Sequence, residues 1–262
     1  MKDYPIKLGS MLFTMVEPHR GHEVEYNRWY ERDHFYAGCM VGAWTFAGAR
    51  FVATRDLKAL RFPDSSPITP DNRLGSYLAL YWILDGHHDE WNRWAVDQVN
   101  WLHANGRMFP HRDHIHTLLY RYEWSVLRDP EGPSAELALD RRYPGLGVVV
   151  GQAAEGVGRE ELASWYRQRL GPWMEGSAVG MCLCFKPLPL LVDAPGDVPR
   201  SEPAEERFMH LYFLEEHPAA LWEGHFVRPA AELEASGLGR VLWASPFVAT
   251  VPGTDTYADQ LH

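Results

Sequence analysis

The sequence predicts an α+β protein in which one unit, with the element order β-α-β-β-α-β, occurs twice. Strand-like and helix-like segments follow each other in the same order in both halves of the 262 residues. A long Pro- and Asp-rich segment interrupts each half at the same place, at 61–75 and at 193–207. Local matches recur at offsets of 136 or 131 residues: Trp29-Tyr30 with Trp165-Tyr166, Leu80-Tyr81 with Leu211-Tyr212, and Trp91 with Trp222.

Helices are expected where apolar and aromatic residues recur about every 3.6 residues, and strands where β-forming residues alternate or run together. In the first half, turn signals at Asp85-Gly86 and Asn105-Gly106 end a strand and a helix. The expected elements of this half are a strand at 9–18, a helix at 23–41, strands at 42–56 and 76–84, a helix at 87–106 and a strand at 114–127.

The second half repeats this order after a segment rich in charged residues and proline. We therefore expect a first unit at 1–126, a linker at 127–144 and a second unit at 145–262. The elements expected in the second unit are a strand at 145–155, a helix at 158–176, strands at 180–192 and 208–216, a helix at 219–237 and a strand at 240–251.

Each such unit forms a four-stranded antiparallel sheet with two helices on one face. The other face must find a second layer if it is apolar. Two units in one chain can cover each other sheet to sheet, and the strand residues that point away from the helices then form a shared, barrel-like interior.

Composition and charge exclude several classes of protein. The formal net charge is -10 and no cluster of Lys and Arg offsets it, which argues against nucleic-acid binding. The apolar run at 77–84 is too short to cross a membrane, and the first residues do not resemble a signal peptide. The chain has three cysteines and no CxxC, which favours a cytoplasmic protein without a disulfide or zinc-finger scaffold.

A short motif on the first predicted helix carries a family resemblance. Trp29, Tyr30 and His34 form the pattern W-Y-x-x-x-H, and Arg50 stands on the strand that follows. This pattern resembles the dimeric α+β barrel superfamily, in particular its EthD-like branch. The resemblance implies two ferredoxin-like units packed as an intramolecular dimeric α+β barrel. The superfamily includes cofactor-free monooxygenases, cyclases, lactone isomerases and haem-using branches, so the resemblance implies a small-molecule enzyme without choosing its reaction.

His34 is the leading catalytic candidate, because an imidazole transfers protons near neutral pH. Tyr30 lies one helical turn earlier on the same face and can donate to an oxyanion. Arg50 is expected to stabilise negative charge, and His116 to serve as a second acid or base. The second half has Leu170 where His34 stands, so only the first half is expected to keep an active pocket.

Rings make up 13% of the residues, and a pocket lined by them would hold a flat ligand. The rings expected to bind such a ligand are Trp29, Tyr77, Tyr81, Trp82 and Trp124. The alternative is that they only fill the core. Which face of the strand at 76–84 meets the helices and which meets the barrel interior stays open, because its residues alternate.

Metal and haem sites are the weaker alternatives. His114 and His116 would face the same way on a regular strand, and with His34 they would make a three-histidine metal site. His210, on a buried strand of the second half, is a candidate axial ligand for haem. We expect neither cofactor.

These observations favour a cofactor-independent enzyme of lyase, isomerase or cyclase type, acting by acid–base catalysis on an aromatic or polycyclic small molecule. The absence of GxGxxG, GxxxxGK[ST], GxSxG and HExxH motifs argues against nucleotide-dependent, hydrolase and zincin mechanisms. The alternatives are an oxygenase, cofactor-free or dependent on haem or a metal, and a non-catalytic binding protein for an aromatic metabolite. A homodimer of the tandem chain is also open.

Overall fold

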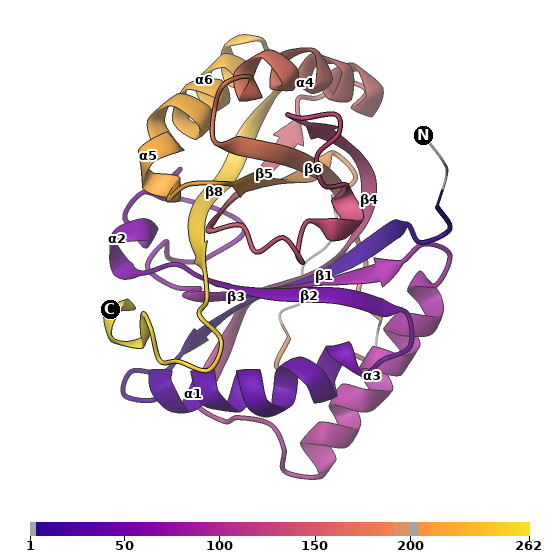
Figure 1. Ribbon diagram of the computed structural model, residues 1–262, viewed down its shortest axis with the longest axis vertical. Coiled ribbons are helices and arrows are strands. Elements are labelled where there is room, and N and C mark those ends of the chain that lie inside the picture. The colour runs from indigo at the N-terminus through magenta and orange to yellow at the C-terminus, as the bar shows by residue number, and fades with distance from the viewer. Residues whose placement is uncertain (1–3, 192, 195, 199–203) are drawn as a thin grey trace.

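The computed structural model describes residues 4–191, 193–194, 196–198 and 204–262. Eight strands close into one barrel, with helices α1 and α3 on one side and α4, α5 and α6 on the opposite side (Figure 1). Residue 192 and parts of the expected loop at 193–207 lie outside the described residues. The predicted fold class, two β-α-β-β-α-β units packed sheet to sheet, is confirmed.

The first unit contains four strands and two helical regions in the predicted order. The helix expected at 23–41 begins as an α-helix and continues as two π-helical turns, η1 and η2. The elements are β1 (Leu8–Pro18), α1 (Glu23–Trp29), η1 (Tyr30–His34), η2 (Tyr36–Met40), β2 (Thr45–Val52), α2 (Arg55–Lys58), β3 (Tyr77–Leu84), α3 (His88–Ala104) and β4 (Arg112–Leu127).

The second unit follows the same order, and its last helical region also contains a π-helical turn. The elements are β5 (Gly145–Ala153), α4 (Arg159–Met174), β6 (Val179–Leu188), β7 (Arg207–Leu214), α5 (Pro218–Trp222), η4 (Glu223–Val227), α6 (Arg228–Ala235) and β8 (Gly239–Ala249). The predicted unit boundaries at residues 126 and 145 remain predictions.

The two units have equivalent strand orders, β4-β1-β3-β2 and β8-β5-β7-β6, and the sheets join edge to edge. The two seams between them differ in length. At one seam β4 pairs with β6 from Leu119–Leu188 to Leu127–Met181. At the other, β2 and β8 pair only at Phe51–Ala249 and Val52–Val248. The fold is therefore held closed mainly along β4 and β6, and the long β4 belongs to both halves of the barrel.

The barrel interior is filled by side chains and is not a hollow. Alternate residues of each strand point inward, away from the helices, and meet the inward residues of the other unit. Trp82 shows this across the two units, because its ring centroid lies 5.8 Å from that of Phe185. The inward residues form one buried cluster that includes Met11, Phe13, Met15, Leu78, Leu80, Trp82, Met181, Leu183, Phe185, Met209, Leu211, Phe213, Trp243 and Phe247.

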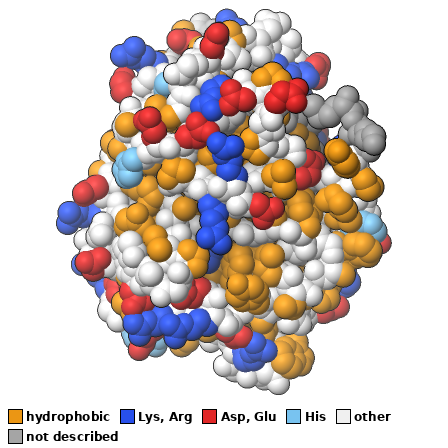
Figure 2. Space-filling model, in the orientation of Figure 1, with side chains coloured by type: hydrophobic (Ala, Val, Ile, Leu, Met, Phe, Trp, Pro, Cys, Tyr) orange, Lys and Arg blue, Asp and Glu red, His pale blue; other side chains and the backbone are white. Residues whose placement is uncertain are grey.

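On the face of the molecule seen in Figure 2, acidic and basic side chains are interspersed with exposed hydrophobic ones. No extended basic patch covers this face. Among the helices of the described residues, none combines the length and the apolar character needed to cross a bilayer.

Candidate functional site

Two cavities lie outside the barrel, one in each half, between the helices and the outer face of the sheet. The first-half cavity has a volume of about 100 Å³ and lies between β1 and β4, the α1–η2 region and α3. Residues of the segment between β6 and β7, including Leu190 and Asp197, complete its wall. The second half therefore contributes to the cavity of the first.

His34 lines this cavity and is fixed on two sides. Its ring stacks on Trp29, with centroids 4.6 Å apart and an interplanar angle of 18°. On its other side the backbone of Gly38 approaches so closely that a Cβ there would lie 2.9 Å from Cε1 of His34. The turn η1 thus holds the imidazole against the helix, and π-helical turns are common at functional sites.

The imidazole of His34 is neutral at physiological pH. Burial lowers its pKa to about 3, and the positive charge of Arg112 acts in the same direction. Nδ1 is fully enclosed and has no hydrogen-bonding partner among the described residues. A buried polar atom without a partner is uncommon in native proteins, and it marks this ring as a functional candidate.

A polar network forms the wall that includes β4. The side chain of Arg112 is buried and donates to Oδ2 of Asp197 at 3.1 Å. His114 lies next to it, with Nδ1 2.9 Å from Oγ1 of Thr117, and Oγ1 of Thr117 lies 2.9 Å from that of Thr14. The cavity therefore combines an apolar lining with one buried cation that is paired to a carboxylate.

Tyr30 lines the cavity and links it to the sheet. Its hydroxyl lies 2.9 Å from that of Tyr81. Burial raises the pKa of Tyr30, so the phenol stays protonated and can donate a hydrogen bond. Arg50 does not line the cavity: its guanidinium lies 4.6 Å from the ring centroid of Tyr30 and donates to Asn27 at 3.0 Å. The guanidinium of Arg50 therefore packs against the ring of Tyr30, outside the cavity that His34 lines.

The alternative of a three-histidine metal site does not agree with the positions of the three rings. A β-bulge between Met15 and Val16 shifts the register of β4, so that Met15 pairs with His116 and Val16 with His114. His114 consequently lies on the helix side, in the cavity, whereas His116 points into the barrel and lies 2.7 Å from the hydroxyl of Tyr120. Within the described residues, no group of three or more His, Cys, Asp or Glu side chains is arranged to hold a metal ion.

The five rings expected to bind a substrate are distributed over four environments. Trp29 supports His34, while Tyr77 and Tyr81 face the helices from β3 and contact Tyr26 and Phe35, respectively. Trp82 is part of the barrel interior. Trp124 lines the second-half cavity and not the first.

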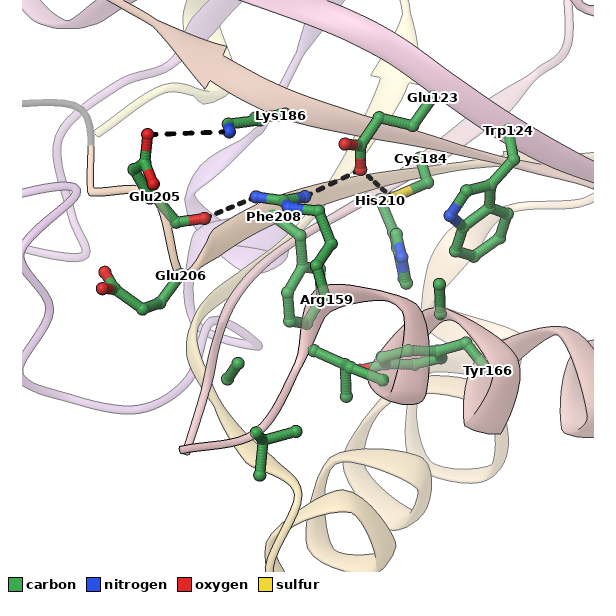
Figure 3. Close-up of a pocket in the computed structure, with 14 residues that line it drawn as sticks. Glu123, Trp124, Arg159, Tyr166, Cys184, Lys186, Glu205, Glu206, Phe208 and His210 are labelled. Carbon is green, nitrogen blue, oxygen red and sulfur yellow. Dashed lines mark hydrogen bonds and ion pairs between the residues drawn. The ribbon is translucent and has the colours of Figure 1, made fainter. Parts of the chain in front are cut away.

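The second-half cavity is larger, about 370 Å³, and lies between α4 and the outer face of β4, β6 and β7 (Figure 3). Arg159 bridges part of it, donating to Oε2 of Glu123 at 2.7 Å and to the carbonyl of Glu205 at 2.6 Å. His210 is 1% exposed and stands among the rings of the lining. Burial lowers its pKa to about 3.

No protein-family model matches the chain. No curated protein sequence matches it either. Similar folds are found among solved structures. An anthrone oxidase-like protein has a TM-score of 0.53 at 9% identity, covering 96% of this chain and 98% of that one. A candidate chlorite dismutase has a TM-score of 0.54 at 10% identity, covering 98% and 100%. The chain has the dimeric α+β barrel fold.

The expectation that no cofactor occurs is contradicted by the fold shared with a candidate chlorite dismutase, which makes haem a cofactor to be tested against the two cavities. With the side chains in these positions, neither cavity accommodates a porphyrin. The first-half cavity is too small for a macrocycle.

In the second-half cavity, His210 is the candidate axial ligand, but aromatic rings enclose it. A porphyrin bound to its imidazole would require several of these rings to move apart. The ring centroids of Tyr166, Phe208, Trp124 and Tyr212 lie 4.4, 4.8, 5.3 and 5.9 Å from that of His210.

Two residues of the first-half cavity have no recognisable signal in the sequence. Arg112 stands at the start of β4, where a charged residue looks like a solvent-exposed strand end. Asp197 lies 85 positions further along the chain, in a loop of the other half, and no local pattern connects the two. His114 and His116 point to opposite faces of β4 because of the β-bulge, and the sequence alone does not reveal this bulge.

Proposed function

We propose that the protein is a small-molecule enzyme that removes a proton from a substrate held in the first-half cavity, with His34 as the base. The observation that carries this proposal is the neutral, enclosed imidazole whose Nδ1 has no partner among the described residues, beside an apolar cavity. A neutral histidine is ready to accept a proton.

The low pKa of His34 describes the protein without a substrate anion. Burial and the charge of Arg112 both disfavour a second positive charge at His34. An anion formed beside the imidazole reverses this balance, because it attracts the imidazolium and offsets the cation. Proton transfer then creates an ion pair in a site with little water, where the attraction is strong.

Tyr30 and Arg112 are the groups that would stabilise the anion. The protonated phenol of Tyr30 lines the cavity and can donate to a developing oxyanion. Arg112 supplies the positive charge that the sequence analysis had assigned to Arg50.

The cavity size limits the substrate. A cavity of about 150 Å³ holds benzene in a protein core, so a cavity of about 100 Å³ takes a single small ring only if its walls move slightly outward. A polycyclic substrate would require the helices to move apart.

Proton removal begins each of the reactions that the sequence favours: lyase, isomerase and cyclase. The EthD-like motif of Trp29, Tyr30 and His34 supports the same base. An oxygenase is the second candidate, since a protein of this fold is described as anthrone oxidase-like, and such an oxidation can begin with the same proton removal. Products formed under air and under nitrogen separate the two.

Hydrogen–deuterium exchange tests the proposed step without knowledge of the final product. The protein is incubated in D₂O with a panel of single-ring ketones and phenylacetic derivatives that carry exchangeable C–H bonds. Mass spectrometry then follows deuterium uptake. We expect catalysed exchange for at least one compound, and a fall of ~10² or more in the H34Q variant.

The matched control is H88Q, because His88 is a helix-side histidine that hydrogen-bonds Ser10 away from this cavity. Exchange in H88Q should equal that of the wild type. Exchange that persists in folded H34Q would remove His34 from the mechanism. A panel compound that binds without exchange or product would favour a binding protein instead.

A further inference from the structure

The second-half cavity is separate from the proposed catalytic site, because the packed barrel interior lies between them. Its volume of about 370 Å³ falls in the range of pockets that hold whole small molecules. Figure 3 shows Trp124 on one side and Tyr166 on α4 on another, with His210 between them. Phe208 adds a further ring. Such a lining suits a flat aromatic ligand.

His210 adds one polar group to this aromatic lining. Nδ1 lies 3.2 Å from the hydroxyl of Tyr212, and no described residue hydrogen-bonds to Nε2. Because the imidazole is neutral, it can form one hydrogen bond with a ligand hydroxyl without burying a charge. A hydroxyl on the bound ring would satisfy this nitrogen.

The two cations at the mouth of the cavity differ in availability. Arg159 is fully engaged by Glu123 and by the carbonyls of Glu205 and Arg207. Among the described residues, Lys186 has one long ionic contact, 4.0 Å from Nζ to Oε1 of Glu205, whose side chain is 88% exposed. Such an exposed ion pair contributes little and is easily exchanged. Lys186 is therefore the cation that a ligand anion can recruit, while Arg159 neutralises Glu123.

We propose that the second-half cavity binds a hydroxylated aromatic carboxylate, with its ring among Trp124, Tyr166 and Phe208, its hydroxyl at His210 and its carboxylate at Lys186. This site is independent of the proton transfer at His34. It gives the second half a function of its own, although the helix position equivalent to His34 is occupied there by Leu170.

Isothermal titration with 4-hydroxybenzoate tests the site directly. We expect saturable binding to one site per chain, and at least tenfold weaker binding of the neutral amide 4-hydroxybenzamide and of benzoate, which lacks the hydroxyl. K186Q should weaken 4-hydroxybenzoate at least tenfold. The matched control is R228Q, which removes a charge from a 72% exposed side chain of the same half and should bind like the wild type.

A cavity-filling variant locates the binding. Ala163 lines the cavity from α4, and A163F would place a ring in it without removing a polar group. Binding should be lost in A163F and kept in H34Q. Equal affinity for the acid and its amide, or binding that survives in A163F, would overturn the proposal. So would a Soret band on titration with hemin that disappears in H210Q, because it would assign the cavity to a porphyrin.

Discussion

Each half of the barrel has a cavity between its first helix and the sheet, but the two cavities lie over different strands and contain histidines on different elements. In both halves a Trp-Tyr pair on the first helix meets edge to face: the ring centroids of Trp29 and Tyr30 are 5.7 Å apart at 87°, and those of Trp165 and Tyr166 are 5.0 Å apart at 89°. The tyrosine of each pair lines the cavity of its own half. The framework is therefore the same.

The histidine beside the cavity belongs to a helix in one half and to a strand in the other. In the first half it is His34 on the helix, and the equivalent position of β3 holds Ala79. In the second half it is His210 on β7, and the helix position holds Leu170. The same arrangement of helix and sheet can therefore carry a buried imidazole on the helix or on a strand, and the cavity beside it then lies over different strands.

Acid sensitivity gives the largest expected effect. Burial lowers the pKa of both His34 and His210 to about 3, whereas an unfolded histidine titrates near ~6.5. Below pH 6.5 the unfolded chain binds more protons, so the stability that these neutral rings contribute is present above that pH and is lost as the pH falls toward 3. Each ring should account for about 3 kcal/mol of lost stability at pH 4.5.

Urea unfolding at pH 7.5 and pH 4.5 measures this loss in the wild type, H34Q and H210Q. Each variant should lose about 3 kcal/mol less than the wild type between the two pH values. If only one of the two variants reduced the pH dependence of the unfolding free energy, the two halves would not be alike in this respect. The two imidazoles would then differ in how fully they are removed from water.

The second largest loss of stability is expected from a substitution in the backbone beside His34. The G38A variant places a Cβ 2.9 Å from Cε1 of His34, and the ring must move or the turn must distort. We expect a loss of about 1–3 kcal/mol in unfolding free energy. Deuterium exchange should fall as well, because the imidazole is displaced from the cavity.

The control for this variant is G171A in the second half. Gly171 lies inside α4, and a Cβ there would meet no atom within 4 Å. Alanine should stabilise this helix by about 0.5–1 kcal/mol. The same substitution would then have opposite signs in the two halves, and a loss of stability in both would show that the contact with His34 is not the cause.

The elements and their order could be predicted because periodicity and turn residues are local signals. The cavities could not, since they depend on register and on contacts between distant segments. The bulge at Met15–Val16 separates His114 from His116, and sequence spacing alone placed them on one face. Asp197 reaches Arg112 only because the second unit folds against the first. His34 and Tyr30 were found because they share one helical face, which is again a local property.

The smallest expected difference lies in the two tyrosine hydroxyls. In Y30F, the hydroxyl of Tyr81 loses its partner at 2.9 Å in a buried site, so we expect a loss of about 1 kcal/mol. In Y166F no hydrogen bond to a described residue is broken, and the change should stay within about 0.5 kcal/mol. Urea midpoints measured side by side resolve this difference. If Y166F lost as much as Y30F, the hydroxyl of Tyr166 would have a partner in the second-half cavity, and the two halves would be more alike there than their side chains indicate.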